Sequence, residues 1–176
     1  MKIKIFILAA IAISCFALSI SAQGKPAPKF TSVYTSLKTT CRDFDGSNGS
    51  DGYSICKGPG GYQVRIYYSA ASTHINAERK GKDDNFPLAT ASVGFDWGKT
   101  KLEWRLANGK PFAVIIRIPK YAEPADGEYY GKVNGQELVV AGLLGYEDLR
   151  TKVDAKTAGA NALAREAADS AYLSKN

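Results

Sequence analysis

The chain has 176 residues, of which 23% are charged and 45% hydrophobic, and its formal net charge is +6. This length suits one domain of ordinary size, and the composition excludes disordered, collagen-like and coiled-coil proteins. The charge favours anionic partners. The densest basic cluster, at residues 79–82, is followed directly by two aspartates, so we expect no nucleic-acid binding.

The first 22 residues have the layout of a secretory signal peptide. A short N-terminal segment with two lysines is followed by an apolar run from Ile5 to Ile20 and by small residues before Gln23. The run is shorter than the ~20 residues that a membrane-spanning helix needs. We therefore expect cleavage after Ala22, a periplasmic or secreted protein and no membrane span in the mature chain, which keeps 154 residues and a net charge of +4.

Cys15 offers an alternative processing site, at which the cysteine would become the acylated N-terminus of a lipoprotein. That cut would leave only a short apolar segment before it and an apolar tail after it, so cleavage after Ala22 is favoured. Residues 23–29 contain two prolines and no apolar pattern, which predicts a disordered lead-in. Residues 30–176 are then a single domain.

Two cysteines remain after cleavage, Cys41 and Cys56, and two cysteines in an oxidising compartment most simply pair. Closing a loop of this length is expected to stabilise the fold by about 3 kcal/mol. A redox-active pair normally has only two residues between its cysteines. We therefore predict a structural disulfide.

Alternating apolar and polar residues predict a series of short strands. Between Tyr62 and Ala70, for example, apolar side chains alternate with Gln63, Arg65 and Tyr67, which indicates a half-buried strand. The Asn134-Gly135 pair predicts the last turn between strands. The candidate strands are residues 30–37, 53–56, 62–70, 73–78, 102–106, 112–118, 129–133 and 137–141.

The clearest local prediction is a hairpin around Asn108-Gly109. A three-residue loop sets Trp104 opposite Phe112 and Leu102 opposite Val114, which gathers the large apolar side chains on one buried face. The other face would carry Glu103, Arg105, Ala113, Ile115 and Arg117.

The last part of the chain, from residue 156 to 173, is rich in alanine and predicts a closing helix whose small-residue face lies flat on the sheet. The fold class is therefore α+β, a mostly antiparallel sheet of five to seven strands with one C-terminal helix packed on it. The residues expected on the packed face are Leu163, Ala164, Ala167, Ala171 and Leu173.

No motif predicts a cofactor, a metal ion or a catalytic residue. The acidic segment Asp43–Asp51 lacks the spacing of an EF-hand, and Gly94–Thr100 has too few residues between its glycines for a phosphate-binding loop. His74 is the only histidine, and the sequence has no Gly-x-Ser-x-Gly elbow. Glu103 is the acid best placed for glycoside hydrolysis, although an ion pair with Arg117 or Lys101 is the simpler expectation.

Five residues are candidates for a binding face that combines charged and aromatic side chains. Such an exposed sheet face binds sugars or peptides in some proteins and is merely solvated in most. The candidates are Arg65, Tyr67, Glu103, Arg105 and Arg117.

Four stretches together resemble a group of small exported bacterial proteins that have no assigned function. They are residues 32–37 ahead of Cys41, residues 56–62, residues 102–113 and residues 160–165 with Ala168-Asp169. The resemblance implies a bacterial periplasmic or secreted setting and contributes no activity or ligand. Members often carry a second cysteine pair towards the C-terminus, which residues 138–146 lack here.

These observations favour a non-enzymatic binding or accessory protein that engages an anionic envelope polymer or another exported protein. The alternative is a small hydrolase that acts on envelope glycans or peptides, in which Glu103 or His74 would matter.

Overall fold

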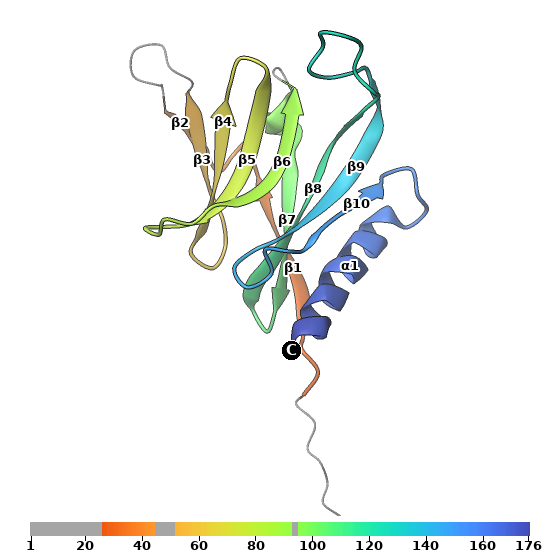
Figure 1. The fold of residues 1–176 in the computed structure, drawn as a ribbon. Helices are drawn as coiled ribbons and strands as arrows, with labels where there is room; N and C mark the ends of the chain where they lie inside the picture. The colour runs from red at the N-terminus through yellow and green to blue at the C-terminus, as the bar shows by residue number, and fades with distance from the viewer. Residues whose placement is uncertain (1–25, 45–51, 93–94) are drawn as a thin grey trace, which may run out of the picture.

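The computed structural model describes residues 26–44, 52–92 and 95–176. The expected signal peptide, its cleavage site after Ala22 and most of the acidic segment Asp43–Asp51 lie outside these residues. The described chain forms two five-stranded antiparallel sheets and one C-terminal helix, which confirms the α+β prediction (Figure 1).

Residues 41–92 form one sheet, and residues 101–154 form the other. The first strand joins the second of these sheets although it precedes both segments in the sequence. Sheet A contains β1 (Phe30–Ser36), β7 (Lys101–Ala107), β8 (Lys110–Tyr121), β9 (Val133–Gly142) and β10 (Arg150–Asp154), in that order. Sheet B contains β2 (Cys41–Phe44), β3 (Tyr53–Lys57), β4 (Tyr62–Tyr68), β5 (Ser72–Arg79) and β6 (Phe86–Ser92), in that order. A short 3-10 helix, η2 (Trp97–Lys99), precedes β7, and α1 (Ala160–Lys175) ends the fold.

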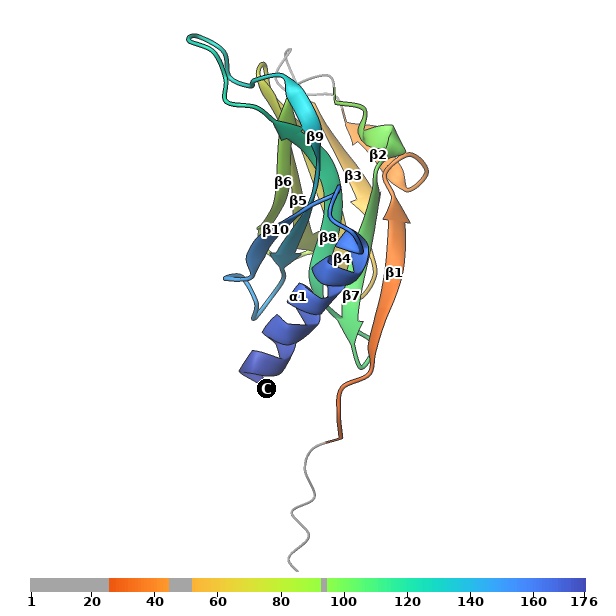
Figure 2. The same ribbon diagram turned by 90° about the vertical axis from the view of Figure 1, so that its right-hand side faces the viewer.

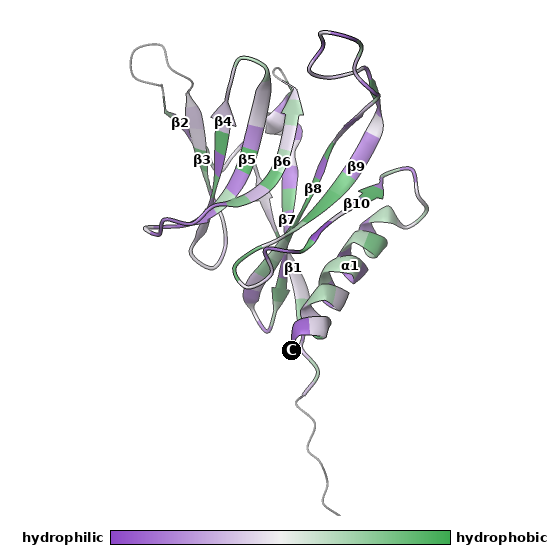
Figure 3. Cartoon of the chain, viewed as in Figure 1, coloured by the Kyte–Doolittle hydropathy of each residue, from purple (hydrophilic) through white to green (hydrophobic). Residues whose placement is uncertain are grey.

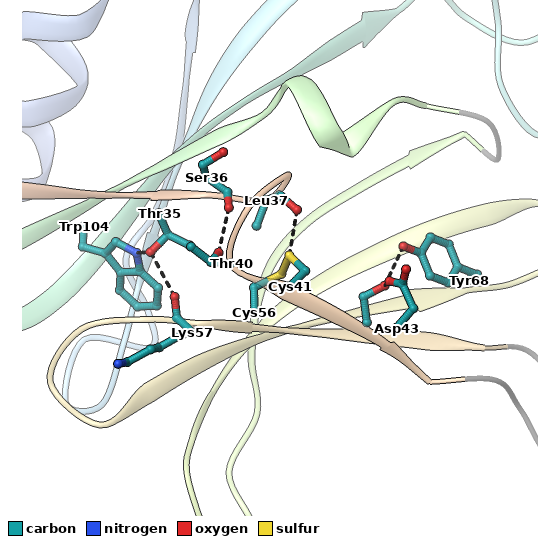
Figure 4. The surroundings of a disulfide bond; sticks show 11 residues. Thr35, Ser36, Leu37, Thr40, Cys41, Asp43, Cys56, Lys57, Tyr68 and Trp104 are labelled. Atoms are coloured by element: carbon teal, nitrogen blue, oxygen red, sulfur yellow. Dashed lines mark hydrogen bonds between the residues drawn. A yellow bond between two sulfur atoms is a disulfide. The ribbon is translucent and has the colours of Figure 1, made fainter.

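The main core lies between the sheets, where the strands turn their apolar side chains towards each other, and Figure 3 shows apolar segments on the strands of both sheets. Trp104 is fully buried at its centre and packs on Tyr62 of sheet B. The Trp104 indole Nε1 donates a hydrogen bond of 2.9 Å to Thr35 Oγ1, which lies on β1. The Thr35 hydroxyl in turn lies 3.4 Å from the Lys57 carbonyl oxygen, so this residue links the two sheets (Figure 4).

The predicted disulfide is confirmed. Cys41 on β2 and Cys56 on β3 lie directly opposite each other in the antiparallel pair and are bonded (Figure 4). The bond fixes the register of an edge strand of only four residues.

Helix α1 covers the outer face of sheet A, as Figure 2 shows. The predicted contact through small residues is confirmed, and Ala164 lies on it as expected, but the two leucines predicted on the same face do not. Ala160, Ala164 and Ala168 are buried against the sheet, whereas Leu163 and Leu173 are 41% and 55% exposed. Alanines spaced four residues apart let the helix approach closely, which leaves the larger leucines on the outside.

The hairpin prediction was right about the Asn-Gly turn and about the face of each residue except Phe112, but wrong about the register. Asn108 and Gly109 form a two-residue turn in which both have positive φ angles, 50° and 81°. An irregularity between Arg105 and Leu106 then shifts the pairing, so Trp104 lies opposite Val114. Phe112 consequently packs on the helix side of sheet A.

Three strands were not predicted, and one turn was placed wrongly. The unpredicted strands β2, β6 and β10 are short or carry polar residues or a proline, so they lack clear alternation. Asn134-Gly135 lies inside β9, which pairs with the far end of β8 across a register shift between Lys120 and Tyr121. Residues 122–132 form the loop that projects beyond the sheets (Figures 1 and 2).

Candidate functional site

The structure does not bring the five predicted binding residues together on one face. Glu103, Arg105 and Arg117 lie on sheet A, on the side that α1 covers. Arg65 and Tyr67 lie on the outer face of sheet B. The prediction of a single face containing all five is therefore wrong, because residues 62–68 and 101–121 belong to different sheets.

Glu103 is held beneath α1 by an arginine of the helix. Its carboxylate accepts hydrogen bonds from Arg165 at 2.6 and 3.1 Å and from the Ser32 hydroxyl at 2.5 Å. Burial raises the pKa of Glu103, but the hydrogen bonds from Arg165 and Ser32 outweigh it, and the net shift is downward. The expected pairing of Glu103 with Arg117 or Lys101 is replaced by this contact, and Glu103 is committed to holding the helix.

Arg105 makes the second charged contact between sheet A and the helix. Its guanidinium donates to the Asp169 carboxylate at 2.6 and 2.8 Å through Nη2 and at 3.1 Å through Nε. Arg105 Nη1 also donates to the Ser32 hydroxyl at 2.7 Å, so the two ion pairs share one serine. Only 8% of the Arg105 side chain is exposed, which leaves it out of reach of a partner.

Arg117 lies near the start of the helix, where its Nη2 donates to the Asn161 side-chain oxygen at 3.2 Å. It lines a hollow of about 500 Å³ that also includes Asp96 and Gln136. This position is separate from both buried ion pairs and from the outer face of sheet B.

The outer face of sheet B carries a row of aromatic side chains that crosses four strands. Phe44 on β2 lies opposite Tyr53 on β3, Tyr53 lies opposite Tyr67 on β4, and Tyr67 lies opposite His74 on β5. We call Phe44, Tyr53, Tyr67 and His74 the aromatic row. Phe44 and Tyr67 are 40% and 39% exposed, so both rings are accessible to a partner.

Arg65 stands beside the aromatic row and is held by both charge and ring contacts. Its guanidinium carbon lies 4.7 Å from the Tyr53 ring centre and 5.7 Å from that of Tyr67. Its Nε donates to the Glu78 carboxylate at 2.7 Å, and Gln63 donates to the same carboxylate at 3.1 Å. Burial raises the pKa of Glu78, but the hydrogen bonds from Arg65 and Gln63 outweigh it and lower the pKa.

His74 ends the aromatic row and lies between two hydroxyl groups. Its Nε2 is 2.8 Å from Ser72 Oγ, and its Nδ1 is 3.2 Å from Thr90 Oγ1. This places a serine hydroxyl within reach of an imidazole, although the second ring nitrogen faces a hydroxyl instead of a carboxylate. The imidazole is exposed, so it can also contact a partner.

The aromatic row as a whole was not predicted from sequence, because Phe44 lies on an unpredicted strand. The signal that could have revealed it is the disulfide. If Cys41 pairs directly opposite Cys56 on antiparallel strands, Phe44 must lie opposite Tyr53.

Comparison of the chain with models of known protein families, with curated proteins and with solved structures gave no significant match. Within the described ranges, no three or more His, Cys, Asp or Glu residues gather as a metal site would require. The helix found in those ranges is neither long nor apolar enough to cross a membrane.

Proposed function

We propose that this protein is an exported, non-enzymatic binding protein that recognises a polysaccharide of the bacterial envelope through the outer face of sheet B. The aromatic row is the observation that carries the proposal. Sugars present apolar C–H surfaces and hydroxyl groups, so a protein site that holds them combines aromatic rings with hydrogen-bonding side chains. This face offers both.

The polar groups of this face are fixed before any ligand arrives. Arg65, Glu78 and Gln63 hold one another by hydrogen bonds, and Arg65 also rests on two tyrosine rings. A surface that is already ordered loses less conformational entropy on binding. The disulfide and the layout of the first 22 residues support an exported location.

Retention on isolated envelope material tests this proposal. The double variant Phe44→Ser/Tyr67→Ser should reduce retention of the purified protein about tenfold, because two exposed rings of the row are removed. Tyr129→Ser is the matched control, since Tyr129 is 83% exposed on the projecting loop away from this face. Equal retention of the double variant and the wild type would refute the proposal, and retention that requires an envelope protein would favour an exported protein partner.

A hydrolase is the second candidate, and the contact between Ser72 and His74 is the observation that favours it. A histidine at this distance can remove the proton from a serine hydroxyl. Ser72→Ala would abolish the release of soluble envelope fragments if Ser72 is the nucleophile. A binding protein instead shows retention without release, and Ser72→Ala leaves that retention unchanged.

A further inference from the structure

A groove next to the aromatic row is lined by three cationic side chains. It has a volume of about 920 Å³, which lies within the range of ligand sites in proteins. Arg42, Lys57 and Lys80 line it, and no carboxylate among the described residues does. Ile55 and Gln63 belong both to the groove and to the outer face of sheet B, so the two surfaces are continuous.

The cations come from three different segments that backbone contacts hold in place. Arg42 and Lys57 each follow a cysteine of the disulfide, and the Lys57 amide donates to the Thr40 carbonyl oxygen at 3.1 Å. The Lys80 amide donates to the carbonyl oxygen of Gly61 at 2.9 Å. The described residues place no carboxylate within ion-pair distance of these three cations, so their charges are not neutralised there.

The glycine-rich turn between β3 and β4 lines the groove and packs closely on sheet A. A side chain at Gly58 would come within 2.8 Å of the Trp104 ring, and one at Gly60 would come within 2.8 Å of Pro111. Gly60 also has a φ angle of 61°, which other residues rarely adopt. The turn therefore packs directly on the core and its neighbouring hairpin.

We infer that this groove binds the anionic groups, carboxylate or phosphate, of an acidic polysaccharide whose sugar rings contact the aromatic row. This inference rests on the proposed function and names its ligand class. Several cations along one groove match repeated anionic groups along one chain, and a neutral glycan would leave them without partners. Single-stranded nucleic acid also combines anions with rings that stack, but the disulfide favours a location outside the cytoplasm.

Affinity measurements with polygalacturonate and with a phosphomannan test the inference, with neutral dextran as the reference polymer. Lys57→Glu/Lys80→Glu should weaken binding to at least one of the acidic polymers about tenfold or more. Lys101→Glu/Lys132→Glu is the matched control, because it makes the same charge change at two exposed lysines, one on β7 and one on the loop before β9, and should weaken binding less than about threefold. A loss of affinity for polygalacturonate indicates carboxylate recognition, and a loss of affinity for the phosphomannan indicates phosphate recognition.

Three results would overturn the inference: no binding of either acidic polymer, equal losses in the two variants, or tighter binding of oligothymidylate than of both polymers. Circular dichroism and thermal unfolding verify that both variants are folded. A failure here differs from a failure of the proposed function. If Phe44→Ser/Tyr67→Ser loses envelope retention while Lys57→Glu/Lys80→Glu keeps it, the aromatic row binds a polysaccharide and the groove does not contribute.

Discussion

Sheet A and sheet B both carry arginines and carboxylates on their outer faces, but α1 covers only the face of sheet A (Figure 1). Under the helix, Glu103 and Arg105 form ion pairs with Arg165 and Asp169 and hold the helix in place. On sheet B, Arg65 and Glu78 form a similar pair, but it lies among exposed aromatic rings. The same residue types therefore hold the helix on one face and support exposed aromatic rings on the other.

The largest expected effect comes from breaking the contact between Arg105 and Asp169. Asp169→Ala leaves a nearly buried guanidinium without its carboxylate, which should lower the free energy of unfolding by about 3–4 kcal/mol. Urea denaturation measures this loss. Glu166→Ala, which removes an exposed carboxylate from the same helix, should change stability by less than about 0.5 kcal/mol. Equal losses in the free energy of unfolding of the two variants would show that the contact between Arg105 and Asp169 does not stabilise the fold.

Sheet B has no helix on its outer face among the described residues, and we expect its edge to depend on the disulfide instead. Cys41→Ser/Cys56→Ala should lower the free energy of unfolding by about 3 kcal/mol or slightly less, since the closed loop spans 15 positions. Comparing urea denaturation of the wild type with and without a reductant gives an independent value. A negligible loss in both experiments would mean that backbone pairing alone holds β2.

The close packing of α1 on sheet A predicts a smaller loss of stability. Ala164 is fully buried against sheet A, so Ala164→Leu should cost about 2 kcal/mol through overpacking. Ala162→Leu places the same side chain on the exposed side of α1 and should be nearly neutral. Thermal unfolding of the two variants compares them directly, and equal midpoints would contradict close packing of the helix.

Acid should weaken the contact between helix and sheet gradually. The pKa of Glu103 is lowered in the folded state, so its contribution is fully present above the ordinary glutamate pKa of about 4.3 and is lost as pH falls through the lowered value. Glu103→Gln should therefore be less stable than the wild type at pH 7, with the difference shrinking towards pH 3. A difference that does not depend on pH would show that the charge of Glu103 contributes nothing.

The sequence was informative where local chemistry decides the structure. The Asn108-Gly109 turn, the paired cysteines and the alanine-rich helix follow from turn geometry, oxidation and helix periodicity, and all three are present. The register near Arg105 could not be predicted, because the irregularity that shifts it serves the packing of Phe112 beneath the helix. That packing depends on residues far away in the chain.

The candidate site was only partly predictable for a related reason. Alternation along β4 placed Arg65 and Tyr67 on an exposed face, and the structure agrees. The same alternation placed Glu103 and Arg105 on an outer face of β7, which is also correct, but it could not show that a helix starting 53 positions after Ala107 would cover them. The alternation along a strand predicts on which side of the sheet a side chain lies, but it does not predict which element packs on that side.

Site-specific photo-crosslinking in cells that express the protein tests the central claim most directly. A photoreactive phenylalanine analogue in place of Tyr67, on the aromatic row, should capture an envelope polysaccharide that mass spectrometry identifies from its sugar fragments. The same analogue in place of Tyr129 or of Leu163, on the exposed side of α1, should capture none. Capture of the polysaccharide from the helix position and not from Tyr67 would contradict the assignment of binding to sheet B.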